Sequence, residues 1–197
     1  MRPSSLPMLA VCPKFVGKPS EATEAGTKRH AALSAYLGGN EDALMDIPEE
    51  ERDGVKWAAE YIRLKAPMAD HPIECEVKRH CLTSDFVRIE GTPDVTCGTH
   101  VFDLKWRMRD YTSQMAAYAL MLMEAGHEEI TVHLLYAEQQ KAVVLKFTRE
   151  TAEAAIAPIM ARASDPNAVA TPCDYCGWCA SAMTCTELVQ RANCVVA

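Results

Sequence analysis

Two carboxylates and a lysine follow one another closely enough to form a metal-binding site. Pro93-Asp94 is followed, after eight intervening residues, by Asp103-Leu104-Lys105. Side chains alternate between the two faces of a strand, so Asp103 and Lys105 should point the same way. A two-residue turn centred on Cys97-Gly98 would place Asp94 diagonally from Asp103, roughly 7 Å away, and a longer loop would place them directly opposite. Either arrangement brings two carboxylates and an amine together.

Such a trio is suited to phosphodiester hydrolysis. Two carboxylates hold a hard cation such as Mg²⁺ or Mn²⁺ through oxygen. The cation polarises the phosphate and makes its bound water more acidic. The lysine can orient the attacking water, accept its proton, or offset charge that builds on the phosphorane. The spacing alone is equally compatible with a hairpin that displays a solvated cluster of two aspartates and a lysine.

The apolar pattern predicts the elements that would position this trio. Helices are expected over 20–37, 46–65, 111–125 and 148–163, and strands over 73–82, 86–91, 99–106, 130–136 and 142–147. The three consecutive strands suggest an antiparallel meander. The helix after them permits a crossover, so the next strand could join in parallel. The expected fold class is α/β, with a mixed central sheet flanked by helices.

Composition limits the class of protein. The 197 residues fit one domain, and 49% apolar with 24% charged residues is typical of globular proteins. The longest apolar runs are shorter than the ~18–20 residues of a membrane span, and the stretch over 6–11 is shorter than a signal-peptide core. We therefore expect a cytoplasmic protein without a membrane partner. The net charge of −7 argues against coating of nucleic acid by bulk attraction but permits a local basic groove.

The cysteines are the second group that could do chemistry. Cys173, Cys176, Cys179 and Cys185 fall within thirteen residues, and Cys12 stands alone near the other end. In a reducing compartment such a cluster is more often a metal site than a set of disulfides or redox pairs. Thiolate sites of this kind bind Zn²⁺ or an iron–sulfur cluster, and the four C-terminal cysteines alone could form one.

The ordered motifs resemble those of a known family. Pro93-Asp94 with Asp103-Leu104-Lys105 resembles the signature of the PD-(D/E)XK nucleases, and specifically of their RecB-like branch, which includes the iron–sulfur nucleases of CRISPR adaptation and AddB-type repair nucleases. Gly26-Thr27-Lys28-Arg29-His30 resembles that branch's G-T-x-x-H helix motif, and 114–118 resembles its Q-x-x-x-Y helix motif. The resemblance covers nearly the whole chain and implies a restriction-endonuclease-like core.

The resemblance also implies roles for individual residues. Metal ligands would be His30, Asp94, Asp103 and the carbonyl oxygen of Leu104. The catalytic set would be Asp94, Asp103 and Lys105, together with Gln114 and Tyr118 beside the site, where they contact substrate or support Lys105. Glu76, on a strand ahead of the catalytic hairpin, would be a supporting residue. Without the resemblance, His30 is an inward-facing core histidine, Glu76 a solvated glutamate, and 111–118 an ordinary amphipathic helix.

Basic residues flank the trio in the sequence. The residues that could contact DNA phosphates are Lys78, Arg79, Arg107 and Arg109. Each of them fits a scattered charged surface equally well.

For the cysteines, the resemblance favours a site that joins the two chain ends. Cys176-x2-Cys179-x5-Cys185 matches the C-terminal triplet of the iron–sulfur branch, and Cys12, followed by Pro13, matches its distant first ligand. This implies a [4Fe–4S] cluster with a structural role, because closing most of the chain into a ring restricts the unfolded state. Cys173 remains an alternative ligand, and the local set that it completes would suit zinc.

Together these features predict one nuclease domain over 1–197. It would comprise a helical part (20–65), a catalytic core (73–163) and a cysteine segment (171–197) that closes on Cys12. The expected activity is metal-dependent DNA cleavage, as an exonuclease or end-processing enzyme, in repair, recombination of a phage or mobile element, or CRISPR spacer processing. Its partners would be DNA ends or single strands, recombination or CRISPR-adaptation proteins, and further copies in a homo-oligomer. The alternatives are a vestigial DNA-binding or assembly module and a zinc-stabilised interaction protein.

Overall fold

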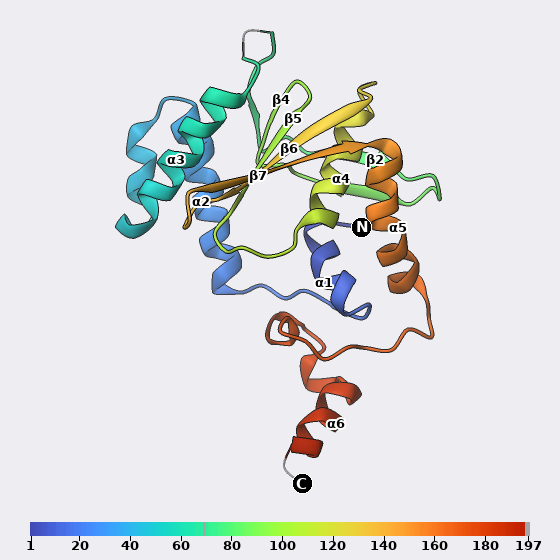
Figure 1. Ribbon diagram of the computed structural model, residues 1–197. Coiled ribbons are helices and arrows are strands. Elements are labelled where there is room, and N and C mark those ends of the chain that lie inside the picture. The colour runs from blue at the N-terminus through green and yellow to red at the C-terminus, as the bar shows by residue number, and fades with distance from the viewer. Residues whose placement is uncertain (69, 196–197) are drawn as a thin grey trace.

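A five-stranded mixed sheet forms the centre of the protein (Figure 1). The computed structural model describes residues 1–68 and 70–195. The strand order is β1 (Glu74–Cys75), β4 (Val95–Cys97), β5 (His100–Lys105), β6 (Glu129–Tyr136) and β7 (Lys141–Thr148). Strands β5 and β6 are parallel and the other neighbours are antiparallel. The predicted mixed sheet and the parallel crossover are therefore present.

Helices cover both faces of the sheet. On one side lie α2 (Glu21–Leu37), a 3-10 turn (Glu41–Asp46) and α3 (Glu49–Lys65), and on the other lie α4 (Thr112–Met123) and α5 (Arg149–Ser164) (Figure 1). The sheet thus separates two cores. Val101 and Phe102 are adjacent on β5, yet Val101 packs with α4 and Phe102 packs with α2 and α3. This alternation follows from the period of two in a strand.

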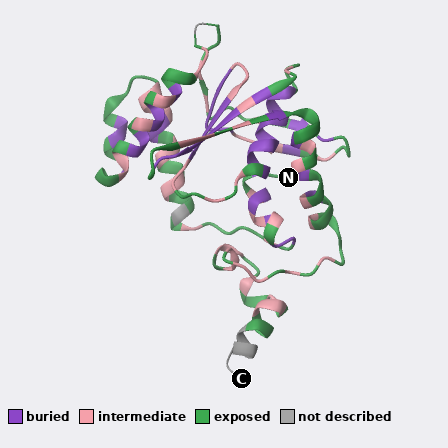
Figure 2. Ribbon diagram, in the orientation of Figure 1, coloured by how far each residue is buried: buried purple, intermediate pink, exposed green. Residues whose placement is uncertain are grey.

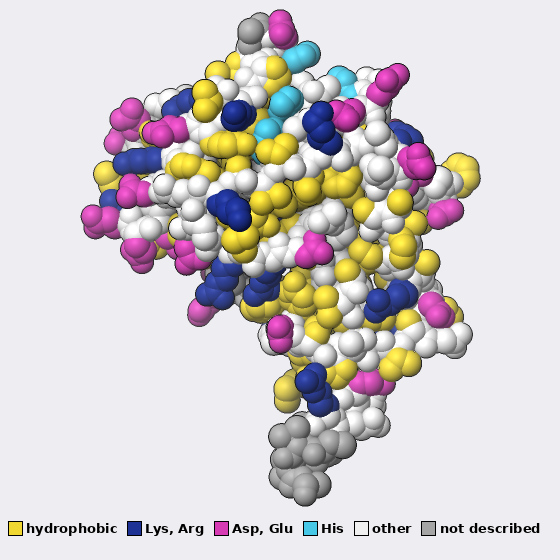
Figure 3. Space-filling model, in the orientation of Figure 1, with side chains coloured by type: hydrophobic (Ala, Val, Ile, Leu, Met, Phe, Trp, Pro, Cys, Tyr) yellow, Lys and Arg dark blue, Asp and Glu magenta, His cyan; other side chains and the backbone are white. Residues whose placement is uncertain are grey.

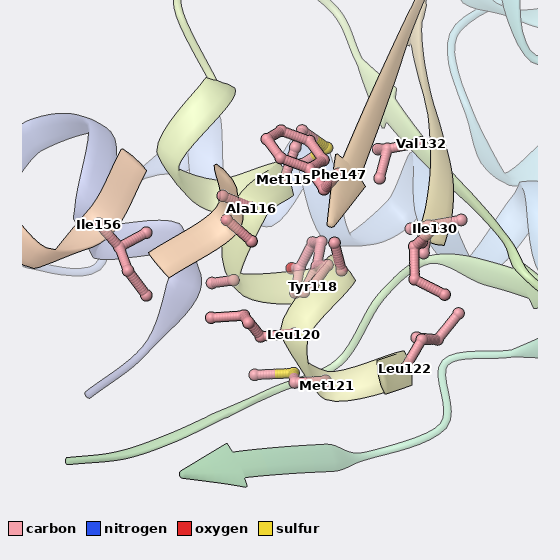
Figure 4. Packing of buried hydrophobic residues seen from close by; sticks show 14 of the residues in the cluster. Met115, Ala116, Tyr118, Leu120, Met121, Leu122, Ile130, Val132, Phe147 and Ile156 are labelled. Atoms are coloured by element: carbon pink, nitrogen blue, oxygen red, sulfur yellow. The ribbon is translucent and has the colours of Figure 1, made fainter. Parts of the chain in front are cut away.

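Helix α4 is the most deeply buried helix. All its residues from 113 to 123 are buried (Figure 2). The cluster around it includes Ile130 and Val132 of β6, Phe147 at the end of β7, and Ile156 of α5 (Figure 4). Because a helix that is apolar on every side must be covered on every side, its few polar residues lie inside the protein.

The expected three-stranded meander is wrong. The predicted strand over 73–82 is interrupted at Glu76, whose φ of 55° is left-handed and incompatible with extended backbone. Before the break, β1 pairs with β4. After it, β2 (Arg79–Leu82) pairs with β3 (Arg88–Gly91) in a separate two-stranded sheet. A short 3-10 turn (Pro3–Ser5) and α1 (Leu6–Val11), which the sequence did not predict, pack near α4 and α5.

The C-terminal segment lies beside the N-terminal segment (Figure 1). It contains two 3-10 turns (Cys176–Trp178 and Ala182–Thr184) and α6 (Thr186–Val195). Gly17 forms a bridge with Cys179, and the N–H of Ala180 donates to the carbonyl of Val16 at 2.7 Å. The last two residues of the predicted 171–197 segment lie outside the described residues. No helix within 1–68 and 70–195 combines the length and apolar character required to cross a membrane.

Candidate active site and cysteine cluster

The hairpin between β4 and β5 brings the two aspartates together. Its register pairs Val95 with Phe102 and Cys97 with His100, so the turn is at Gly98-Thr99, one residue later than the two-residue turn considered above. Gly98 adopts a φ of +55°, which glycine tolerates without strain. Continued by one residue, this register places Asp94 directly opposite Asp103. The structure therefore has the second of the two arrangements that the sequence allowed.

Asp94 is buried and held from two sides. Its Oδ2 accepts a hydrogen bond from the N–H of Leu104 at 2.7 Å, and its Oδ1 lies 3.3 Å from Nδ1 of His30. Burial raises the pKa of the Asp94 carboxyl, His30 opposes this rise, and Asp103 adds to it. A carboxylate in this position is strongly favoured by any further positive charge.

Asp103 is fully buried, and only one of its carboxylate oxygens has a close partner. Nζ of Lys105 lies 2.5 Å from its Oδ2 and forms an ion pair with it. Within the described residues, Oδ1 of Asp103 has no hydrogen-bond donor. Leaving buried carboxylate oxygens without a donor is costly. A divalent cation between Asp94 and Asp103 would satisfy them, so these residues fit the metal that the sequence predicts.

Lys105 is charged in this setting. Burial disfavours its ammonium, but the neighbouring Asp103 and Asp94 carboxylates outweigh burial and raise the pKa of Lys105. The ring of Tyr111 lies on another side, with its centroid 4.9 Å from Nζ. In the sequence Tyr111 was only the first residue of a predicted helix. Its place over Lys105 depends on the loop that joins β5 to α4.

His30 and Glu76 complete the acidic end of the site. One nitrogen or oxygen from each of His30, Glu76 and Asp94 lies within 4.8 Å of the others. His30 Nε2 also lies 3.3 Å from the Leu104 carbonyl oxygen. Burial and Asp94 raise the pKa of Glu76, and His30 lowers it. Glu76, expected as a supporting residue, thus lies among the predicted metal ligands, because its left-handed backbone turns the chain at this point.

Gln114 and Tyr118 tie α4 to the segment that precedes Asp94. Nε2 of Gln114 donates to the Tyr118 hydroxyl at 3.1 Å, and that hydroxyl donates to the carbonyl of Thr92 at 3.2 Å. Burial raises the pKa of Tyr118, and the carboxylates of Asp103 and Asp94 raise it further. The tyrosine therefore remains a hydrogen-bond donor. Thr92, which the sequence did not single out, receives this bond.

The four predicted DNA-contacting residues are dispersed. Lys78 pairs with Glu90 at 3.1 Å, and Arg79 pairs with Glu74. Arg107 is exposed, whereas the guanidinium of Arg109 lies over aromatic rings of the cysteine segment. On the face shown in Figure 3, Lys and Arg side chains are mixed with Asp and Glu side chains.

All five predicted cysteines line one cavity of about 350 Å³. They are Cys12, Cys173, Cys176, Cys179 and Cys185. Sγ of Cys12 accepts a hydrogen bond from the N–H of Thr171 at 3.3 Å, and Sγ of Cys176 accepts one from the N–H of Cys173 at 3.2 Å. Burial raises the pKa of the Cys173 thiol. Cys12 and Cys173 both remain available as the fourth ligand.

The spacing of these sulfur atoms bears on the choice of metal. Four thiolates around one zinc ion would lie about 3.8 Å apart, given a Zn–S bond of about 2.3 Å. Among the described residues, no three cysteine sulfurs lie within 4.8 Å of one another. Each thiolate of a four-iron cluster binds a different iron, so the ligands stand further apart. The sulfur atoms thus stand further apart than a bound zinc ion would hold them, and the five cysteines of the cavity supply enough donors for either group.

Comparison with known proteins adds information about the fold. No family model and no curated protein matches the sequence. The mixed α/β fold resembles a solved structure named "Putative exonuclease" from Eubacterium rectale, with a TM-score of 0.51 and 11% identity over 93% of this chain and 87% of that one. SSO0001 gives a TM-score of 0.47 and 12% identity over 95% and 86% of the two chains. At these identities the likeness concerns the fold alone.

Proposed function

We propose that this protein is a metal-dependent nuclease that hydrolyses phosphodiester bonds in DNA, as an exonuclease or end-processing enzyme. The observation that carries the proposal is the fully buried Asp103 carboxylate, which lies opposite Asp94 and has Nζ of Lys105 2.5 Å from its Oδ2. Burial of a carboxylate lowers the stability of a fold, and such costly groups are typical of functional sites. The fold shared with the "Putative exonuclease" supports the same class.

In this proposal His30, Asp94, Asp103 and the Leu104 carbonyl hold Mg²⁺ or Mn²⁺. Glu76 would assist, since its carboxylate lies within 4.8 Å of the ligand atoms of His30 and Asp94, a group that does not include Asp103. The bound ion would polarise the phosphate and acidify a water molecule. Of the three roles that the sequence allowed for Lys105, its ion pair with Asp103 favours the two that use a charged ammonium: orienting the attacking water and offsetting negative charge.

In this proposal Gln114 and Tyr118 position the backbone that leads to Asp94. Their hydrogen bonds fix the Thr92 carbonyl, two residues before Asp94, relative to α4. Because α4 is packed on all sides, it is a rigid support for that segment. The pair also lies close enough to Asp103 and Asp94 for those charges to affect Tyr118, so a substrate contact remains part of the proposal.

The cysteine cavity would hold a [4Fe–4S] cluster on Cys12, Cys176, Cys179 and Cys185. Its role is structural, since it would join segments that otherwise meet through a few main-chain hydrogen bonds. Zinc bound with Cys173 is the alternative. The substrates would be DNA ends or single strands, in the cytoplasm, with recombination or CRISPR-adaptation proteins or further copies of the chain as partners.

The test is cleavage of end-labelled single- and double-stranded DNA by protein purified without oxygen, with Mg²⁺, with Mn²⁺ and with chelator. Cleavage should require the metal and should be lost in Asp103→Asn and Asp94→Asn, which change charge with little change in shape. Asp85→Asn, at an exposed hairpin turn, is the matched control and should remain active. Undiminished, metal-dependent cleavage by Asp103→Asn would show that the site assignment is wrong.

A further inference from the structure

The loop from residue 106 to 111 connects the candidate active site to the cysteine segment. It begins directly after Lys105 and ends at the first turn of α4. In its middle, the guanidinium of Arg109 lies 4.7 Å from the ring centroid of Trp178 and 5.3 Å from that of Tyr175. These two aromatic residues flank Cys176 on either side in the sequence. Arg109 therefore lies over two side chains of the segment that carries a predicted cluster ligand.

The aromatic platform under Arg109 also includes the N-terminal segment. Tyr175 and Trp178 pack against each other with centroids 5.9 Å apart, and Phe15 meets Tyr175 edge to face at 6.4 Å. Phe15 is three residues after Cys12. The platform is therefore made of two rings from the C-terminal segment, and one of them also meets a ring from the N-terminal segment.

The same loop fixes the ring that covers Lys105. The carbonyl of Arg109 accepts a hydrogen bond from the Tyr136 hydroxyl at 3.0 Å, and Tyr136 is the β6 partner of Lys105. Two residues later, the Tyr111 ring lies 4.9 Å from Nζ of Lys105. The loop is anchored at both ends, since Trp106 packs against the core and the Tyr111 carbonyl accepts a hydrogen bond from the N–H of Met115 at 3.0 Å. Between them Arg107 and Met108 are exposed, so Arg109 holds the middle of the loop.

We propose that Arg109 is a positioning residue, which transmits the state of the cysteine site to Lys105 through Tyr111. When Trp178 and Tyr175 are in place, Arg109 holds the loop so that the Tyr111 ring confines the Lys105 ammonium beside Asp103. When Trp178 and Tyr175 are displaced, the loop loses this support and the Tyr111 ring no longer confines Lys105. The catalytic consequence rests on the proposed nuclease function, whereas the structural link does not.

The physical reason is the flexibility of lysine. Its ammonium is a point charge on a four-carbon stem with several rotatable bonds, so a position needs contacts on more than one side. Asp103 attracts the Lys105 ammonium from one side by its charge, and the face of the Tyr111 ring attracts it from another side through a cation–π interaction. Removal of the ring should leave Lys105 charged but less confined. Chemistry would then slow while DNA binding stays the same.

The activity-independent test is NMR of the full-length, anaerobically purified protein with ¹³Cε-labelled lysine. The resonance of Lys105, assigned with Lys105→Arg, should carry a ring-current shift from Tyr111. That shift should persist in Tyr111→Phe and disappear in Tyr111→Leu. It should fall by more than half in Trp178→Leu and in Arg109→Leu, but not in Trp178→Phe. A wild-type shift in both Trp178→Leu and Arg109→Leu would overturn the proposal.

Cleavage kinetics form the second arm. Tyr111→Leu and Arg109→Leu should lower kcat about tenfold with KM within about twofold of wild type, and Tyr111→Phe should retain wild-type kcat. A rise in KM with an unchanged kcat would contradict a positioning role. Arg109→Leu leaves every cysteine-segment residue unchanged, so its effect does not require loss of the bound metal, which is measured in parallel. If wild-type protein cleaves no DNA, the nuclease proposal fails and the NMR arm still decides the link.

Discussion

His133 is buried with a neutral imidazole, and acid should therefore weaken the fold. Only 4% of this residue is exposed. Its Nδ1 lies 3.1 Å from the Tyr61 hydroxyl, its Nε2 lies 3.0 Å from Nδ1 of His100, and its ring stacks on Phe102 at 4.5 Å. Burial, followed by His100 and Lys65, lowers the pKa of His133 to about 4. The folded protein resists protonation here.

The sign and size of the effect follow from linkage. Below roughly pH 6.5 the unfolded chain binds a proton at His133 that the folded protein does not bind until about pH 4. The stabilisation is thus complete above pH 6.5, decreases as the pH falls, and is lost below about pH 4. A pKa difference of this size corresponds to about 3 kcal/mol of unfolding free energy, as an upper figure.

The assay is urea denaturation at several pH values between 7.5 and 4 for wild type, His133→Gln and His80→Gln. The difference between wild type and His133→Gln isolates this residue from the carboxylates, which titrate in both proteins. That difference should shrink by about 3 kcal/mol from pH 7 to pH 4. His80 is exposed, so His80→Gln should follow wild type throughout. A difference independent of pH would refute the reasoning.

The remaining predictions concern the two sites and one turn. Lys105→Ala should lose most DNA cleavage yet retain metal and DNA binding, measured by calorimetry and gel shift. His30→Ala should weaken Mn²⁺ binding in calorimetry, and unchanged affinity would return His30 to a core role. Protein purified without oxygen should be brown with about four irons per chain. Cys12→Ala should lose that iron and melt at lower temperature, whereas Cys173→Ala should not, and the reverse result would favour the local set. Gly98→Ala should cost about 1–2 kcal/mol in urea denaturation, because φ is +55° and the new Cβ would lie 2.5 Å from His71.

The sequence alone determined the elements with strong periodicity. Alternation along 100–105 places Asp103 and Lys105 on one face of β5, as the structure has them. The helix over 111–125 and its crossover led to the parallel pairing of β5 with β6. These features depend on local preferences and on one apolar pattern, so distant parts of the chain were not needed to infer them.

Tertiary structure decided what depends on distant contacts. The left-handed turn at Glu76 broke a strand that the apolar pattern made continuous, and it moved this carboxylate next to His30 and Asp94. Tyr111 lies over Lys105, and Arg109 lies over Trp178 about seventy residues away, through contacts that only the folded chain makes. Such contacts join residues far apart in the sequence, and no local propensity encodes them. Only the packed chain selects which of the possible partners meet.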